Sequence, residues 1–89
     1  MPVISMFYGI IVRMFYFDNQ EHHLPHIHIE YSDQKAVLSI PDGNLIAGKF
    51  SGNKLKLVLA WVEIHKDELM ADWALAVEGN TVFKIDALK

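Results

Sequence analysis

The sequence has 89 residues, of which 52% are hydrophobic and 21% are charged, and its formal net charge is −3. This length predicts one domain, residues 1–89, with a single modest core, and the apolar content excludes a disordered chain. The absence of cysteine excludes disulfides and thiolate sites, and the negative charge with a single arginine, Arg13, argues against strong nonspecific binding to nucleic acid.

The first seventeen residues are apolar enough to raise the question of targeting or membrane insertion. Arg13 interrupts this run, and the run has neither the basic start nor the small-residue cleavage site of a signal peptide. It is also shorter than the ~20 apolar residues that span a bilayer. We therefore expect a cytoplasmic protein that does not enter a membrane.

Strand-like runs and turn signals alternate through the first half of the sequence. Pro2–Met6 is expected to be a short edge strand, Gly9 permits a turn, and Ile10–Phe17 is rich in the β-branched and aromatic residues that favour a central strand. Arg13 lies on an otherwise apolar face of that strand, so it requires a strand edge, a carboxylate or a bound anion.

Three further strands are expected to follow, joined by short turns. They are His26–Tyr31, Lys35–Ile40 and Leu45–Phe50, with a turn at Pro41-Asp42-Gly43-Asn44. Consecutive strands with short connections predict an antiparallel meander.

A long helix is expected from Asn53, as its cap, to about Glu78, with Gly79 as a left-handed stop and a bend near Lys66–Asp67. Thr81–Asp86 is expected to form a last short strand at an edge. The order of elements predicts an α+β fold, in which an antiparallel sheet of four to five strands packs against one long helix.

The helix is apolar around most of its circumference. One arc is expected to lie on the sheet, and it contains Leu55, Val58, Leu59, Val62, Leu69, Trp73, Ala76 and Val77. A second arc includes Trp61, Ile64 and Leu75, and it requires a further neighbour. Our hypothesis is that these three residues face another subunit, a protein partner or the N-terminal segment. His65 is expected to pair with Glu68 or Asp72.

The segment from His22 to Tyr31 contains four of the five histidines. In an extended strand, His26, His28 and Glu30 share one face, whereas Ile27, Ile29 and Tyr31 share the other. The apolar face is expected to join the core, which would leave the histidine face replaceable without loss of the fold.

Three interpretations of the histidine face stay open. The histidines can be structural, with hydrogen bonds to neighbours or water. They can bind a divalent metal, with His26 and His28 as ligands and Glu30, His22 or His23 completing the set. They can also perform metal-free acid–base chemistry on RNA, with His26 and His28 transferring protons and Arg13 binding phosphate; in that case no cofactor is expected.

The order of these residues resembles a family of small bacterial proteins, domain-of-unknown-function family 4160, over essentially the whole chain. The matching residues are Met1–Ser5, Phe7–Gly9, Ile11–Tyr16, Pro25–His28, Tyr31, Asp42-Gly43, Gly48-Lys49, Trp61, His65, Glu68-Leu69 and Trp73. Leu24 replaces a common proline and Ile27 a common phenylalanine of the family.

Genes of this family often lie beside a second small gene, and the pair has been proposed to be a toxin–antitoxin module. The resemblance therefore implies a toxin-like cytoplasmic protein with a small protein partner, the antitoxin. It does not imply a target, and RNA as the target comes from the acid–base interpretation of His26, His28 and Arg13. A homo-oligomer also fits the second apolar arc. The alternative is a non-enzymatic binding or regulatory module that uses the same histidine strand.

Overall fold

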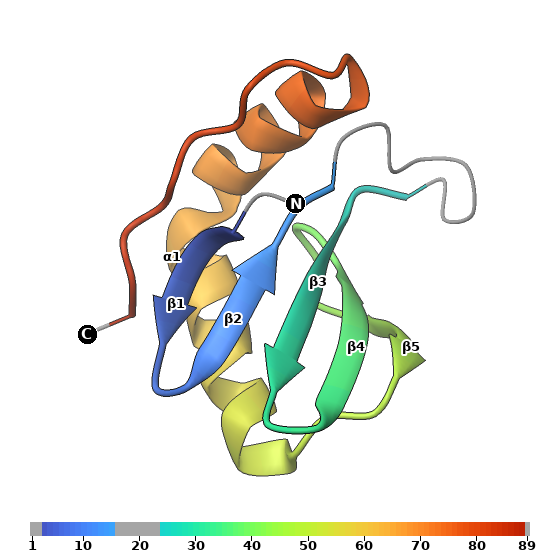
Figure 1. The fold of residues 1–89 in the computed structure, drawn as a ribbon, viewed down its shortest axis with the longest axis vertical. Helices are drawn as coiled ribbons and strands as arrows, with labels where there is room; N and C mark the ends of the chain where they lie inside the picture. The colour runs from blue at the N-terminus through green and yellow to red at the C-terminus, as the bar shows by residue number, and fades with distance from the viewer. Residues whose placement is uncertain (1–2, 16–23, 89) are drawn as a thin grey trace.

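Five strands follow one another in chain order through one antiparallel sheet in the computed structural model, which describes residues 3–15 and 24–88 (Figure 1). The elements are β1 (Val3–Phe7), β2 (Ile10–Arg13), β3 (His26–Tyr31), β4 (Gln34–Ser39), β5 (Leu45–Gly48) and α1 (Gly52–Val77). Each strand pairs with the next, so β1 and β5 are the edges. The predicted α+β fold is confirmed.

A two-residue turn closes each of two hairpins, β1–β2 and β3–β4. Tyr8 and Gly9 both have positive φ, 51° and 80°, as the type I′ turn between twisted strands requires. Ser32 and Asp33 connect β3 to β4, and there only the first residue, Ser32, has a positive φ, 56°. These turns fix the registers that place the polar residues described below.

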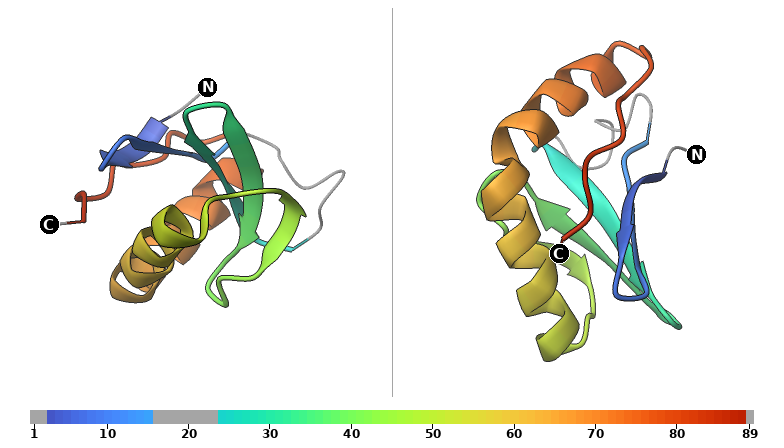
Figure 2. Two further views of the ribbon diagram at one scale, coloured as in Figure 1. Left: turned by 90° about the horizontal axis from the view of Figure 1, so that it is seen from below. Right: turned by 90° about the vertical axis from the view of Figure 1, so that its left-hand side faces the viewer.

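The helix α1 covers one face of the sheet, as the two further views in Figure 2 show. Alternating strand residues point toward it, because successive side chains of a strand face opposite sides. The buried core between sheet and helix includes Ile10, Val12, Ile27, Ile29, Leu38, Val58, Val62 and Leu69. Ile27 and Ile29 are therefore core residues as predicted, whereas Tyr31 is only half-buried.

Several strand ends differ from the predicted ones. β1 lies one residue later than Pro2–Met6, and β2 ends at Arg13, before the predicted end at Phe17, which is outside the described residues. β5 ends at Gly48, where the backbone has a φ of 82° that a regular strand cannot continue. Residue propensity alone does not reveal such ends.

The helix begins at Gly52, after Ser51 at the N-cap position, so the prediction of Asn53 as the cap is wrong. Its end is confirmed, because Gly79 has a φ of 78° and the Asn80 amide donates to the carbonyl of Leu75 at 2.9 Å. A kink lies at His65, one residue before the predicted bend. Within residues 3–15 and 24–88, no helix is long and apolar enough to cross a bilayer.

Residues 80–88, called the C-terminal segment below, return along α1 toward β1 (Figures 1 and 2). The predicted strand Thr81–Asp86 is wrong, because this segment forms no strand and a single described backbone hydrogen bond, from the Ile85 amide to the carbonyl of Ile4 at 2.8 Å, joins it to β1.

Side chains of α1 hold the C-terminal segment in place of a strand ladder. Asp72 Oδ1 accepts the amide hydrogen of Phe83 at 3.0 Å. Trp61 Nε1 donates to the carbonyl oxygen of Asp86 at 2.7 Å. These two bonds come from the helix rather than from the sheet, which explains why an extended segment lies near β1 without pairing along it.

Asp72 is a buried carboxylate on α1, and burial raises its pKa because the ionised form loses water. The hydrogen bond from the Phe83 amide favours the ionised form and opposes this shift, whereas the negative charge of Glu68 adds to it. The folded state therefore holds the Asp72 proton more tightly than an exposed carboxyl would.

Gly48 is a position where a side chain has no room. An added Cβ would overlap the carbonyl oxygen of Lys35 and lie 2.8 Å from the Cα of Ala36, and the positive φ adds strain. We expect Gly48→Ala to lower the free energy of unfolding by more than about 1 kcal/mol in urea unfolding. The control is Gly52→Ala, where no atom lies within 4 Å of the added Cβ. Equal effects of both substitutions would contradict this explanation.

The raised pKa of Asp72 predicts a pH-dependent stability. Because the unfolded carboxyl returns to its ordinary pKa, the free energy of unfolding falls as pH rises from about 4 through the raised pKa. Asp72→Asn should remove this loss, so the stability of the variant relative to the parent should increase as the pH rises above about 4 in urea unfolding.

Asp67→Asn is the control for this measurement, because Asp67 is an exposed carboxylate on the same helix. Its stability relative to the parent should change little over the same pH range. A relative stability of Asp72→Asn that stays constant with pH would show that burial of this carboxylate is not the cause.

Candidate functional site

Polar and aromatic side chains gather on the face of the sheet away from α1. The register pairs Arg13 of β2 with His28 of β3, and Ile11 with Glu30. Arg13, Phe15, His28 and Glu30 are half-buried there. We call these four residues the outer-face cluster.

Arg13 and Glu30 form an ion pair across the two strands. The Arg13 Nε lies 3.3 Å from Glu30 Oε1, and the side chains are 23% and 27% exposed. The two residues are diagonal neighbours in the antiparallel pair, a spacing that long side chains bridge. Arg13 thus has a carboxylate partner, which is one of the three surroundings that the sequence left open, and a guanidinium with five donors retains capacity for an anion.

His26 lies at the start of β3 and is fully buried. Its Nδ1 is 2.7 Å from the carbonyl oxygen of Leu24, and because that oxygen only accepts, Nδ1 carries the proton. The imidazole ring lies 4.9 Å from the ring of Trp73 and 5.3 Å from that of His28. The premise that His26 lies on a face outside the core is therefore wrong, and its replaceability without loss of the fold stays an untested prediction.

His28 is more accessible than His26. Its ring meets the ring of Phe15 edge to face, with centroids 4.3 Å apart. His28 therefore lies between an aromatic ring, a buried histidine and the arginine opposite it in the register. Of the two histidines predicted to transfer protons, His28 is the one that a bound molecule would reach.

The predicted metal ligands do not form a ligand set in the described residues. Residues 3–15 and 24–88 contain no group of three His, Asp or Glu side chains arranged to hold an ion. Glu30 is directed to Arg13 instead. His22 and His23, which were the further candidates, lie outside the described residues.

The three helix residues predicted to bind a partner differ in exposure. Trp61 is fully buried under the C-terminal segment and its ring packs 5.3 Å from that of Phe7, so the chain itself covers it. Ile64 is 64% exposed, and Leu75 is half-buried. Ile64 is the one of the three that largely reaches solvent, so the partner surface stays a prediction at that residue.

His65 pairs with Glu68, as predicted, with Nδ1 2.6 Å from Oε1. This pair lies at the kink of α1, away from the outer-face cluster. Sequence reasoning missed two other polar residues, Ser5 and Asp72, which are both buried. Their only sequence signal is a polar residue inside an apolar run, and it does not distinguish a buried position from an exposed one.

The family comparison covers the strands that carry this cluster. The model of the family described as "Domain of unknown function (DUF4160)" matches residues 9–74, more than half of the chain. That range includes all of β2 to β5 and most of α1. Neither the curated proteins nor the solved structures gave a significant match. The chain belongs to the DUF4160 family.

Proposed function

We propose that this protein is a toxin-like component of a bacterial toxin–antitoxin module and that it acts on RNA through the outer-face cluster. The observation that carries the proposal is the pairing of Arg13 with His28 in the sheet register, beside Glu30, on the face that α1 leaves uncovered. The family resemblance supports a two-protein module in the cytoplasm. The chemistry rests on the side chains themselves.

RNA cleavage requires a base, a proton donor and a cation, and this cluster offers the base and the cation. His28, whose imidazole can act as a general base, removes the proton of a ribose 2′-hydroxyl. The resulting oxygen bonds to the adjacent phosphorus while the bond to the 5′-oxygen breaks, and a water molecule protonates that leaving oxygen. Arg13 offsets the negative charge that develops on the phosphate, and Glu30 orients the guanidinium.

His26 has a different role in this proposal. Its ring is buried, with Nδ1 bound to the Leu24 carbonyl, and it lies beside the His28 ring. We therefore assign it to positioning His28 rather than to contact with RNA. The net charge of −3 disfavours nonspecific binding, so binding depends on this local site.

A non-enzymatic binding or regulatory module is the second candidate. The burial of His26 between Trp73 and His28 favours it, because aromatic contacts of this kind also serve a purely structural purpose. In that case the outer-face cluster would hold a protein or an ion without chemistry. Growth and RNA cleavage separate the two candidates.

The first test is induced expression of the parent and of His28→Ala in a bacterial host. We expect the parent to arrest growth and the variant not to, because the variant lacks the base. The matched control is His65→Ala, which removes a histidine that pairs with Glu68 on α1 and should still arrest growth. Circular dichroism should show both variants folded. A well-expressed parent that leaves growth unchanged would reject the toxin proposal.

The second test concerns Arg13. We expect Arg13→Gln to weaken RNA binding by the purified protein and to reduce the slope of log affinity against log salt by about one phosphate contact. Lys56→Gln is the control, since Lys56 is an exposed cation on α1. If the two substitutions change the slope equally, Arg13 has no special contact with phosphate.

A further inference from the structure

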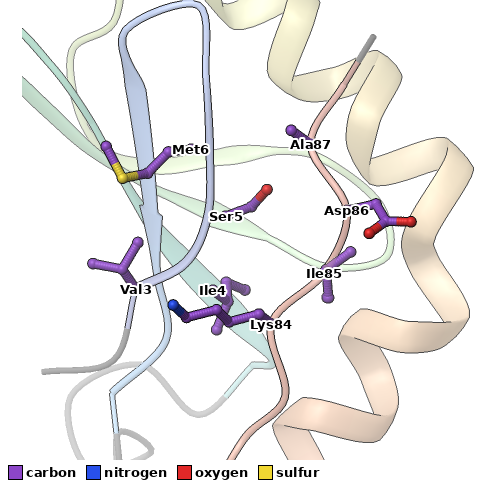
Figure 3. Close-up of a pocket in the computed structure, with 8 residues that line it drawn as sticks. All are labelled: Val3, Ile4, Ser5, Met6, Lys84, Ile85, Asp86 and Ala87. Carbon is purple, nitrogen blue, oxygen red and sulfur yellow. The ribbon is translucent and has the colours of Figure 1, made fainter.

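A cavity of about 320 Å³ separates β1 from the C-terminal segment (Figure 3). Residues 3–6 of β1 line one side, and residues 84–87 line the other. This cavity is at the opposite edge of β2 from β3, so it is distinct from the outer-face cluster. Its volume is at the lower end of the range for ligand sites in proteins.

Strand pairing begins at one end of this cavity and does not continue. The C-terminal segment runs in the same direction as β1 (Figures 1 and 2), and the Ile85 amide donates to the carbonyl of Ile4. A parallel ladder would next join the Met6 amide to the Ile85 carbonyl. No such bond occurs among the described residues, where the two segments share only the first.

The hairpin geometry directs backbone groups of β1 into this gap. The two-residue turn makes Phe7 and Ile10 the hydrogen-bonded pair, so Met6, opposite Ile11, belongs to a pair without hydrogen bonds. The amide and carbonyl of Met6 therefore point away from β2, toward the C-terminal segment. An edge strand with its backbone groups presented in this way is a template for another strand.

Ser5 supplies an independent observation. Its side chain is only 7% exposed, it lines the cavity, and its Oγ has no hydrogen-bond partner in the described residues. Figure 3 shows this hydroxyl directed toward the C-terminal segment. A buried hydroxyl without a partner costs about 1–3 kcal/mol. The missing partner is a polar group that would enter the gap.

We propose that the cavity between β1 and the C-terminal segment binds an extended peptide segment of a protein partner. The peptide backbone pairs with the amide and carbonyl of Met6, and a polar group of the peptide meets Ser5 Oγ. Lys84 and Asp86 line the C-terminal side, where the Lys84 side chain reaches toward β1 and the Asp86 carboxylate is directed away from it (Figure 3). The proposal rests on the proposed function only in naming a protein as the partner.

The experiment selects binders from a library of random nine-residue peptides displayed on phage, with the full chain as the target. We expect enriched peptides to shift the backbone amide signals of residues 3–7 and 84–88 in NMR spectra of the labelled chain. N-methylation of alternate peptide amides should abolish binding, because it removes strand hydrogen bonds. Failure to enrich such peptides overturns the proposal.

Two serine substitutions separate binding from folding. Ser5→Ala should weaken the selected peptide by about fivefold or more while leaving the free protein as stable or more stable, since it removes an unpaired hydroxyl. The control is Ser39→Ala, because the buried Ser39 Oγ accepts the Asn44 amide at 3.0 Å. That variant should lose stability but bind the peptide normally. Reversed effects on peptide affinity would reject the assignment of Ser5.

Two other occupants are outcomes of the same measurements. If the C-terminal segment closes on β1 in solution, the amides of Met6 and Ala87 will be protected from hydrogen exchange in the free monomer. If a second copy occupies the gap instead, sedimentation will show a dimer and no peptide will shift the signals of residues 3–7 and 84–88. Either result overturns the proposal. Peptide binding should persist in His28→Ala. A failure of the peptide proposal is therefore distinguishable from a failure of the toxin proposal in the growth test.

Discussion

Burial of one sheet face under α1 is the constraint on which the rest of the structure depends. Ile27 and Ile29 have no exposed surface, so His28, which lies between them, and Glu30, which follows, must face the other way. A one-residue slip of β3 would place His28 in the core and an isoleucine in solvent. The same burial that stabilises the fold therefore fixes the side of the sheet on which His28 and Glu30 meet Arg13.

Trp61 extends this constraint to the end of the chain. Its ring is buried against Phe7 of β1, and its indole nitrogen holds the carbonyl of Asp86. Because one side chain contacts the sheet, belongs to the helix and binds the C-terminal segment, it fixes how closely that segment approaches β1. The C-terminal segment is anchored to the helix and does not form a ladder of hydrogen bonds along β1. This arrangement leaves the gap beside Ser5.

Alternation and turn chemistry sufficed to predict the fold and the two faces of β3. They were less informative where burial depends on a segment distant in sequence. Trp61 has the helical position predicted for a partner-binding residue, but Phe7 and the returning residues 80–88 bury it. The alternation along β3 places His26 on the face opposite the core, yet the Trp73 ring lies against it. Asp72 is a charged residue of the kind that usually lies on the solvated face of a helix, yet it is buried beside the Phe83 amide.

The two proposed sites are close enough to affect each other. β1 is the immediate neighbour of β2, and Val3 pairs with Arg13 in the register. A peptide strand added to β1 would lie two strand spacings from β2, which is about 10 Å. Alternate side chains of that peptide would point to the same face as Arg13 and His28. A partner bound by its backbone at β1 would thus place its side chains beside the outer-face cluster, where bulk or an acidic group would compete with a phosphate.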